Sequence, residues 1–326
     1  MIKTGWMLAL SLASVLAPGS ATFAAGAPDY PTKPVRLIVP YPPGGGVDIV
    51  ARVMTDRLSQ ILKQPFLAEN RAGAGGVIGT ELVARAAPDG YTILFGTSAG
   101  LVINPLITKS KLPYDPINDL APVSLLFTSP MLVTVVNDLP IRSIKDLIGY
   151  AKANPGKLNY ASAGIGAPNH VATELFKFMT GTDMVHIPFK GFGPGIADMM
   201  GGQVQVMFNP VTGLLPYVKS GKVRALGVSA PQRVSALPDV PTIIEAGLPG
   251  YEYELWYSIM APAKVPAPII ATLNREIVRI IAEPETRQKF AGGEPRSSTP
   301  EGLAKLIREE FDRIGKVVKA ANITAD

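Results

Sequence analysis

Short apolar runs alternate along this chain with longer segments in which apolar residues recur every three or four positions. The short runs are typical of buried strands, and the longer segments are typical of helices that bury one face. The predicted strands cover residues 35–41, 91–96, 123–128, 131–136, 158–163, 184–189, 204–208, 223–229 and 258–261. The predicted helices cover residues 48–63, 143–154 and 266–282, a segment after His170, and a last helix that begins at Thr299 and Pro300.

This alternation predicts an α/β fold, because strands that are separated by helices pair in parallel through right-handed crossovers. The length of 326 residues suggests about two domains. Ser129-Pro130 separates two predicted strands, and a second break falls in the Pro/Gly/aromatic stretch 247–253. We therefore expect two domains hinged together, each a mostly parallel sheet flanked by helices. Domain 1 is discontinuous and contains residues 28–129 plus 251–326, and the inserted domain 2 contains residues 130–250.

The composition narrows the classes of function. Hydrophobic residues make up 47% and charged residues 17%, so a large core can form and disorder is not expected. The sequence has no cysteine and two histidines, which excludes disulfides, thiol nucleophiles and a Cys/His zinc site. We predict no metal and no cofactor. The net charge is +5, but the Lys and Arg residues do not form a cluster along the sequence, which argues against a nucleic-acid partner.

The first 27 residues are typical of a secretory signal peptide. Lys3 is followed by the apolar run 6–16, by a Pro-Gly-Ser break and then by small residues. Pro18 stops the apolar run well short of the roughly 18 residues that a membrane anchor needs. We expect cleavage between Ala24 and Ala27 and export of the mature chain, and an uncleaved anchor is the alternative.

The first candidate binding segment, residues 40–48, lies between a predicted strand and a predicted helix. Its glycines leave main-chain N–H groups open to a ligand, and the helix start adds unpaired donors and a partial positive charge, which favours an anion. Asp48 is either the N-cap of the helix or a hydrogen-bond acceptor for a ligand. The sequence matches neither a P-loop nor a dinucleotide-binding fingerprint. The candidate ligand-binding residues here are Tyr41, Pro43, Gly44, Gly45, Gly46 and Asp48.

The second segment, Gly96-Thr97-Ser98-Ala99-Gly100, spells G-x-S-x-G, the nucleophile-elbow pattern of α/β-hydrolases. Because both histidines lie downstream, a serine hydrolase is an alternative function. The match is short, however, and an Asn-Pro pair soon interrupts the long helix that such an elbow should start. We favour a strand-end loop that lines a binding cleft through Thr97, Ser98 and Ala99, and an ordinary tight turn is the other interpretation.

Two more glycine-bearing segments follow predicted strands in the second half of the chain. Residues 162–170 lead into a helix start, where His170 either contacts a carboxylate or packs against and caps the helix. The candidates in this segment are Ser162, Gly164, Gly166, Ala167 and His170. Residues 188–195 contribute the candidates Phe189 and Lys190, of which Lys190 is either a charge partner for an acidic ligand or an ordinary surface lysine. Asn209 ends a further strand and could line the same cleft with its neutral amide, whereas His186, within a strand, is interpreted as a packing residue.

Together these segments resemble the Bug family, the TctC-like extracytoplasmic receptors of tripartite tricarboxylate transporters. The resemblance covers nearly all of the mature chain in the right order. The matching stretches are residues 30–48 (YPTKPVRLIVPYPPGGGVD), 69–79 (ENRAGAGGVIG), 88–98 (PDGYTILFGTS), 159–170, 188–194 (PFKGFGP), 201–209 (GGQVQVMFN), 237–247 (LPDVPTIIEAG) and 256–262.

The resemblance implies a two-domain periplasmic-binding-protein fold of the Venus flytrap, type II-like kind. It implies a periplasmic receptor rather than an enzyme, in which a small carboxylate is clamped between the domains. In that family the carboxylate is held largely by main-chain amides and ordered water from the loops numbered here 40–48, 97–100 and 162–170. The implied partner is a membrane permease of the tripartite tricarboxylate transporter type, and we expect the receptor to be a monomer. A ligand-sensing accessory protein for a signalling system is a further alternative.

Three positions depart from the pattern of that family. The chain has Phe189 where the family usually has tyrosine, Ala167 where it has serine, and Asn209 where it often has aspartate. The loss of two hydroxyls and one negative charge makes the pocket less polar and less repulsive to a second carboxylate. We therefore predict a carboxylate with a sizeable apolar body, aromatic or medium-chain dicarboxylic, rather than citrate or an amino acid.

Overall fold

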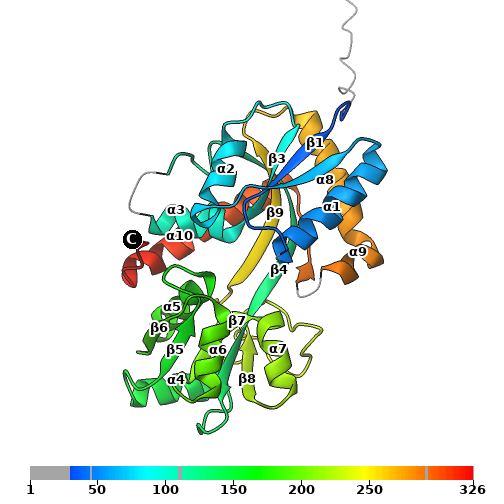
Figure 1. Cartoon of the computed structure of the whole chain (residues 1–326). Helices are drawn as coiled ribbons and strands as arrows, with labels where there is room; N and C mark the ends of the chain where they lie inside the picture. Colours follow the sequence, from blue (N-terminus) through cyan, green and yellow to red (C-terminus); the bar gives the residue numbers. More distant parts are fainter. Residues whose placement is uncertain (1–29, 45, 109–111, 291–292, 326) are drawn as a thin grey trace, which may run out of the picture.

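The computed structural model describes residues 30–44, 46–108, 112–290 and 293–325. The predicted signal peptide, residues 1–27, and the candidate Gly45 lie outside the described residues. Figure 1 shows two groups of strands and helices, here called the first lobe (above) and the second lobe (below), connected by β4 (Leu120–Val136) and β9 (Glu254–Pro262). Within the described ranges, no helix is long and apolar enough to cross a membrane.

The first lobe contains the described chain up to the middle of β4 and again from β9 to the C-terminal helix. Strands β2, β1 and β3 pair in parallel, β3 pairs antiparallel with β9, and β9 pairs antiparallel with β4. Besides the two connecting strands, its elements are β1 (Val35–Val39), α1 (Gly46–Leu62), β2 (Phe66–Asn70), η1 (Ala74–Gly76), α2 (Val77–Ala84), β3 (Thr92–Thr97), η2 (Ala99–Ile103), α3 (Asn104–Ile107), α8 (Ala267–Ala282), α9 (Pro284–Lys289), β10 (Glu294–Pro295) and α10 (Pro300–Ala320).

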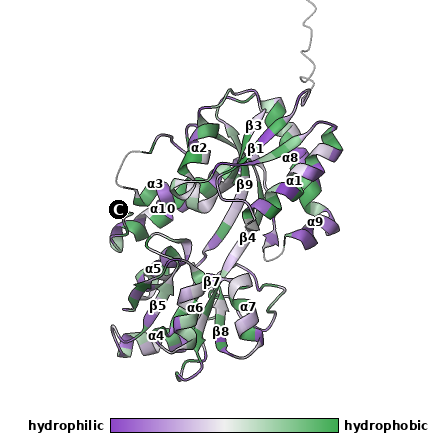
Figure 2. Ribbon diagram, in the orientation of Figure 1, coloured by the Kyte–Doolittle hydropathy of each residue, from purple (hydrophilic) through white to green (hydrophobic). Residues whose placement is uncertain are grey.

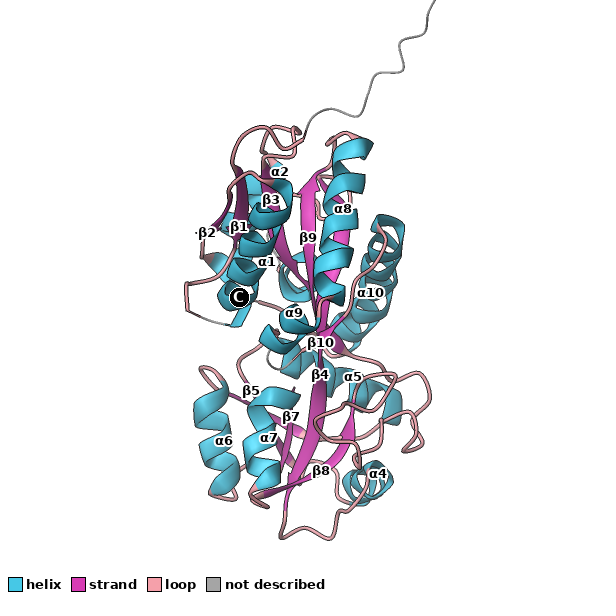
Figure 3. Ribbon diagram, turned by 90° about the vertical axis from the view of Figure 1, so that its right-hand side faces the viewer, coloured by secondary structure: helices cyan, strands magenta, loops and turns pink. Residues whose placement is uncertain are grey.

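The second lobe is built on the second half of β4. This half pairs antiparallel with β7 and β8, and β7, β5 and β6 pair in parallel. Figure 3 shows α6 and α7 on one side of these strands and α4 and α5 on the other. The elements are α4 (Ile144–Ala153), β5 (Asn159–Ser162), α5 (Pro168–Thr180), β6 (Val185–Pro188), α6 (Phe192–Met200), β7 (Val206–Pro210), α7 (Val211–Lys219) and β8 (Val223–Val228).

The predicted α/β architecture is confirmed, with one refinement of the strand directions. The strands that alternate with helices are parallel, as the pattern predicts. The connecting strands β4 and β9 run antiparallel to each other and to their other neighbours. Because the chain leaves the first lobe along β4 and returns along β9, the two strands must run in opposite directions.

The prediction of separate strands at 123–128 and 131–136 is wrong, because both belong to β4. Pro130 lies opposite Glu254 at the end of the β9 ladder, and the next residue, Met131, lies opposite Pro210 of β7. A proline fits within a strand where the ladder does not need its missing N–H. The change of partner falls beside the predicted domain boundary at 129/130, while the boundaries themselves stay a prediction.

The apolar residues form three buried clusters. One packs α1 and α8 against the first-lobe strands, and another packs α6 and α7 against the second-lobe strands. The largest cluster extends through both lobes, and it includes Leu94 and Leu303 of the first lobe together with Phe176 of the second lobe and Tyr251 of the return segment. Figure 2 shows hydrophobic and hydrophilic positions on α1, α8 and α10, as expected for helices that cover a core with one face.

Local capping explains where two predicted helices begin. The Ser143 hydroxyl accepts a hydrogen bond from the Asp146 amide at the start of α4, and the Thr299 hydroxyl accepts one of 3.0 Å from the Gly302 amide at the start of α10. A side-chain oxygen at the N-cap pairs an amide that the helix leaves without a partner. Both helix starts were predicted from the sequence and are confirmed.

Candidate functional site

The directions of the strands place the candidate loops between the two lobes. β9 runs from the second lobe into the first, so β3, which is antiparallel to β9, and β1, which is parallel to β3, both end toward the second lobe. β4 runs into the second lobe, so β7, which is antiparallel to β4, ends toward the first lobe, as do β5 and β6. The loops after β1, β3, β5, β6 and β7 therefore face the same space from two sides.

The register along β4 gives the separation of these strand ends along the strand direction. Thr97, at the end of β3, lies opposite Tyr257 of β9, which in turn lies opposite Phe127 of β4. Pro210, at the end of β7, lies opposite Met131 of β4. Phe127 and Met131 are four residues apart, which is about 13 Å along an extended strand. The separation is compatible with a small organic molecule held from both sides.

Asp48 holds the first loop together. One carboxylate oxygen accepts hydrogen bonds from the Gly44 amide and the Arg52 guanidinium, both at 3.0 Å, and the other accepts one of 2.9 Å from the Asn70 side chain. Burial alone would raise the pKa of Asp48, but the hydrogen bonds from Arg52, Gly44 and Asn70 together lower it to about 2. The interpretation of Asp48 as the N-cap is wrong, because α1 already begins at Gly46 and Asp48 lies within its first turn. Its ionised carboxylate instead ties the first loop to Arg52 and Asn70.

The first and second loops are joined by a direct side-chain contact. The Tyr41 and Thr97 hydroxyls are 2.9 Å apart, and Asn70 donates a hydrogen bond to the Tyr41 carbonyl. Pro43 and Gly44 remain exposed at the surface of the loop. Gly44 has φ of 86°, a left-handed conformation that a side chain would disfavour. The loop therefore presents main chain rather than side chains at this point, with the Gly44 amide itself paired to Asp48.

The second loop does not form a nucleophile elbow with a histidine. The Thr97 hydroxyl accepts a hydrogen bond from the Gly100 amide, and the Ser98 hydroxyl accepts one of 3.4 Å from the Trp256 amide. In the described part of the chain, no histidine hydrogen-bonds to Ser98. Ala99 begins the π-helical turn η2, which leads only to the four-residue helix α3. Ser98 is buried, and its observed role is to join β3 to β9.

The third loop is bonded internally. The Ser162 hydroxyl accepts a hydrogen bond from the Gly164 amide, and the ring nitrogen Nδ1 of His170 accepts one of 3.0 Å from the Gly166 amide. The Ala167 amide bonds to the Gly164 carbonyl. His170 is buried, so its observed contacts are those of a packing and capping residue. A Cβ placed on Gly166 would overlap Ile107 of α3, which shows that this loop touches the first lobe.

The remaining candidates lie around this third loop. Phe189 is half-buried, and its amide donates a hydrogen bond to the Ser162 carbonyl. Asn209 is buried, and its side-chain oxygen accepts a hydrogen bond of 3.3 Å from Asn169. Lys190 is exposed. Phe189 and Asn209 therefore belong to the same bonded region as Ser162, whereas Lys190 points to solvent.

Sequence reasoning missed three side chains that shape these loops. Asn70 bridges Asp48 and the Tyr41 carbonyl from the end of β2, and Asn169 bonds both the loop amides and Asn209. Arg52 pairs with Asp48 one helical turn along α1. The spacing of Asp48 and Arg52 was a usable signal, because residues four apart on a helix are neighbours. The roles of the two asparagines depend on contacts between distant segments.

Two α/β lobes joined by two strands, with glycine-bearing strand ends facing each other, define a two-domain binding protein of the periplasmic class. Residues 50–323 match the tripartite tricarboxylate transporter family receptor, TctC, and the chain belongs to this family. Receptors of this family are solute-binding proteins. The resemblance predicted from the sequence is therefore confirmed.

The relatives agree with this assignment over nearly the full length. Protein BugT of Bordetella pertussis is 36% identical over 312 residues, which is 95% of this chain and 94% of BugT. The solved structure of R. palustris Rpa4515 with adipate has 35% identity and a TM-score of 0.74, covering 90% of this chain and 99% of that one. MatC from Rhodopseudomonas palustris with bound malate has 33% identity and a TM-score of 0.70, covering 89% of this chain and 100% of that one.

Proposed function

We propose that this chain is a periplasmic, monomeric solute receptor that clamps a small dicarboxylate between its two lobes and delivers it to a membrane permease. The observation that carries this proposal is the direction of the strands, which turns five strand-end loops from two lobes toward the same space. Membership of the TctC family and the adipate and malate found on similar proteins support a carboxylate as ligand. The signal-like first 27 residues support export.

The ligand-lining set of this proposal is the one predicted from the sequence. It consists of loops 40–48, 97–100 and 162–170 together with Phe189, Lys190 and Asn209. Phe189 and Ala167 are half-buried in the third-loop region and carry no hydroxyl, and Asn209 carries no charge. Such a pocket favours a dicarboxylate with an apolar body, such as a medium-chain or aromatic diacid, over citrate or an amino acid.

The mechanism follows from the fact that the chain passes between the two lobes twice. We place the domain boundaries at 129/130 and 250/251, where β4 changes partners and the chain returns toward β9. A ligand that contacts loops from both lobes gains contacts only in the closed form, so it shifts the hinge equilibrium toward closure. The closed face is then the surface that a permease recognises.

Thermal unfolding with a panel of acids tests this function. Adipate, phthalate, malate, citrate and glutamate are each added to the purified protein. A ligand at 100 times its dissociation constant stabilises the folded state by about 2.7 kcal/mol, which raises the melting temperature by several degrees. We expect shifts with adipate or phthalate. A shift with citrate alone would contradict the ligand class, and no shift with any acid would contradict the receptor function.

Two glycines offer a matched test of the first loop. Gly44 and Gly221 both have left-handed φ angles, 86° and 69°, and no atom lies within 4 Å of a Cβ placed on either. Replacing either by valine therefore introduces similar backbone strain, on the order of 1–3 kcal/mol. Only Gly44 lies in a candidate loop. We expect Gly44→Val to abolish the ligand-induced shift and Gly221→Val to keep it, and equal loss in both variants would contradict the loop assignment.

A further inference from the structure

At the start of the third loop, most main-chain N–H groups donate hydrogen bonds to side chains rather than to main-chain carbonyls. The Gly164 amide donates to the Ser162 hydroxyl at 3.1 Å, the Gly166 amide donates to His170 Nδ1 at 3.0 Å, and the Ala163 amide donates to the Asn169 side chain at 3.1 Å. The shape of this loop therefore depends on the hydrogen-bonding state of a few side chains. Among these three acceptors, only the histidine changes that state between pH 4 and 8.

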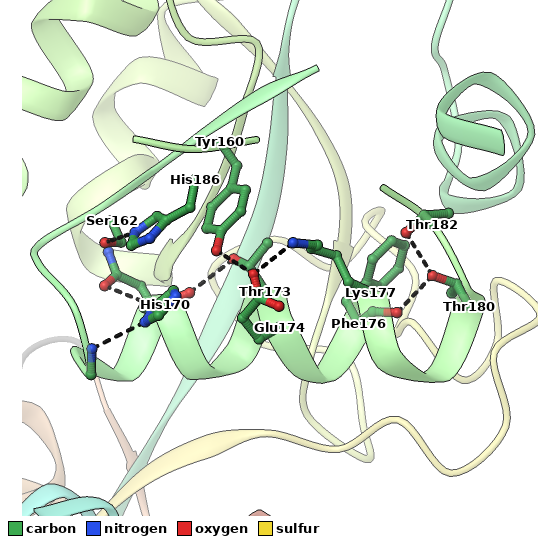
Figure 4. Close-up of polar contacts among 12 residues, drawn as sticks. Tyr160, Ser162, His170, Thr173, Glu174, Phe176, Lys177, Thr180, Thr182 and His186 are labelled. Atoms are coloured by element: carbon green, nitrogen blue, oxygen red, sulfur yellow. Dashed lines mark hydrogen bonds and ion pairs between the residues drawn. The ribbon is translucent and has the colours of Figure 1, made fainter. Parts of the chain in front are cut away.

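His170 is part of a stack of three rings, which Figure 4 shows in part. The His170 and His186 rings are 3.9 Å apart and nearly parallel, and Tyr160 stacks on His186 at 4.9 Å. The Ser162 hydroxyl lies 2.6 Å from His186 Nε2. The stack therefore joins residues of β5, β6 and α5. It includes His170, which accepts the Gly166 N–H, and it contacts Ser162, which accepts the Gly164 N–H.

The bond from Gly166 sets the protonation state that His170 must have. A ring nitrogen that accepts an N–H carries no proton itself, so His170 is neutral with its proton on Nε2. Protonation of Nδ1 would place an N–H against the Gly166 N–H, and the hydrogen bond would be lost. Because Gly166 packs against Ile107 without room for a Cβ, the loop cannot shift there without changing its contact with the first lobe.

The surroundings of the two rings keep them neutral near neutral pH. Burial lowers the pKa of His170, and burial together with the neighbouring His170 lowers the pKa of His186 to about 4. Two charged groups of α5 act on the pair, Glu174 raising and Lys177 lowering the pKa of each ring. Strands β5, β6 and β7 and helix α3, which lie near these rings, contain no Asp, Glu, Lys or Arg. On α10, which packs on α5, Glu310 and Arg313 pair with each other.

We propose that His170 is a positioning residue for the ligand: its neutral ring holds the Gly166 amide, and with it the third loop, in the shape that receives a carboxylate. The inference rests on the proposed function and adds a regulation to it. Acidification below the neutral range protonates His170, frees the Gly166 amide and weakens ligand binding. His186, stacked on His170, stays neutral during this step, because a positive charge on His170 lowers the pKa of His186 further.

Two substitutions test separately whether the Nδ1 acceptor or the aromatic ring of His170 is needed. His170→Phe keeps a stacking ring but has no acceptor, whereas His170→Asn has a side-chain oxygen at the position of Nδ1 and does not titrate. A third variant, Lys177→Gln, removes a positive charge that lowers the pKa of His170 and leaves the loop contacts in place. Circular dichroism of each variant verifies that it is folded.

The experiment measures adipate affinity by calorimetry between pH 8 and pH 4.5. We expect the dissociation constant of the unmodified protein to rise by up to about tenfold per pH unit below the pKa of His170, relative to that of His170→Asn at the same pH. Dividing the dissociation constant of the unmodified protein by that of His170→Asn at the same pH removes the effect of protonating adipate itself. His170→Phe should bind weakly at every pH, and Lys177→Gln should move the loss of affinity to higher pH.

Identical pH profiles for the unmodified protein and His170→Asn would overturn the proposal, as would unchanged affinity in His170→Phe. A second measurement needs no ligand. In nuclear magnetic resonance spectra, the Gly166 amide shift should follow the titration of His170, and an amide shift that stays constant through that titration would refute the inference. A failure of adipate and the other acids to bind would count against the proposed function alone.

Discussion

At the residue scale, the most informative side chain in the core is a hydroxyl without a partner. In the described chain, Ser258 of β9 is completely buried, and its hydroxyl makes no hydrogen bond. An unpaired buried polar group costs about 1–3 kcal/mol. We expect Ser258→Ala to raise the free energy of unfolding by about 1 kcal/mol in urea denaturation.

The matched control is Ser124, which is equally buried in the neighbouring strand. Its hydroxyl lies within hydrogen-bond distance of the Leu125 and Ser298 carbonyls, at 2.8 and 3.0 Å, and its oxygen accepts a hydrogen bond from the Ser298 amide. Ser124→Ala should therefore lower the free energy of unfolding. If both substitutions destabilised the protein equally, Ser258 would have a partner that the structure does not show.

A second prediction at this scale concerns Asp48. Asp48→Asn keeps the shape of the side chain but weakens the bonds to Arg52 and the Gly44 amide, so we expect a loss of about 1–3 kcal/mol of stability and weaker adipate binding. The pKa of Asp48 is lowered from 3.8 to about 2 on folding. Its contribution is thus fully present above pH 3.8 and is lost as the pH falls toward 2.

The pH dependence distinguishes this electrostatic role from a loss of packing. Denaturant midpoints measured between pH 5 and pH 2 should converge for Asp48→Asn and the unmodified protein, because Asp48 loses most of its charge-dependent stabilisation as the pH approaches its folded-state pKa of about 2. A difference that stayed constant down to pH 2 would show that the charge of Asp48 is not what holds the loop.

The site residues also show what a single sequence reveals. The loops around Gly44, Thr97 and Gly166 were found because glycine between a strand and a helix is a local signal. The partners that shape those loops are not local: Asn70 reaches Asp48 across 22 residues, and Asn169 reaches Asn209 across 40. A single sequence contains no record of such pairings.

At the element scale, helix starts are the features that local chemistry predicts best. The Ser143 and Thr299 caps each satisfy one amide of an exposed first turn. We expect Ser143→Ala and Thr299→Ala each to lower the free energy of unfolding by about 1 kcal/mol, measured by urea denaturation. Adipate affinity should not change in either variant, and an effect below a few tenths of a kcal/mol would mean that the caps contribute nothing.

Strands were harder to predict than helices, because their pairing is settled far away in the chain. Strand β2 has Leu67 on its exposed face, so its apolar pattern is weak, and its place at the edge of the sheet comes from pairing with β1. The continuity of β4 through Ser129 and Pro130 depends on β9 and β7, which lie about 80 to 125 residues further along. Local propensity alone favours a break at Pro130.

At the scale of the whole molecule, the shared apolar cluster determines how the protein unfolds. Two lobes with separate cores would melt independently, but the largest cluster contains Leu94 and Leu303 of the first lobe together with Phe176 and Tyr251, whose rings contact each other edge to face. The Tyr251 hydroxyl also donates to the Ala172 carbonyl of α5. We expect one cooperative thermal transition, with a calorimetric enthalpy close to the van't Hoff enthalpy.

The link between the lobes can be tested by weakening it at one point. Tyr251→Ala leaves a cavity where the lobes share their core, so scanning calorimetry should show a broadened or divided transition, because the two lobes no longer unfold together. Leu214→Ala, in the cluster confined to the second lobe, should lower the melting temperature through a cavity of similar kind but keep a single transition. Two separate transitions in the unmodified protein would show that β4 and β9 join the lobes without coupling their stability.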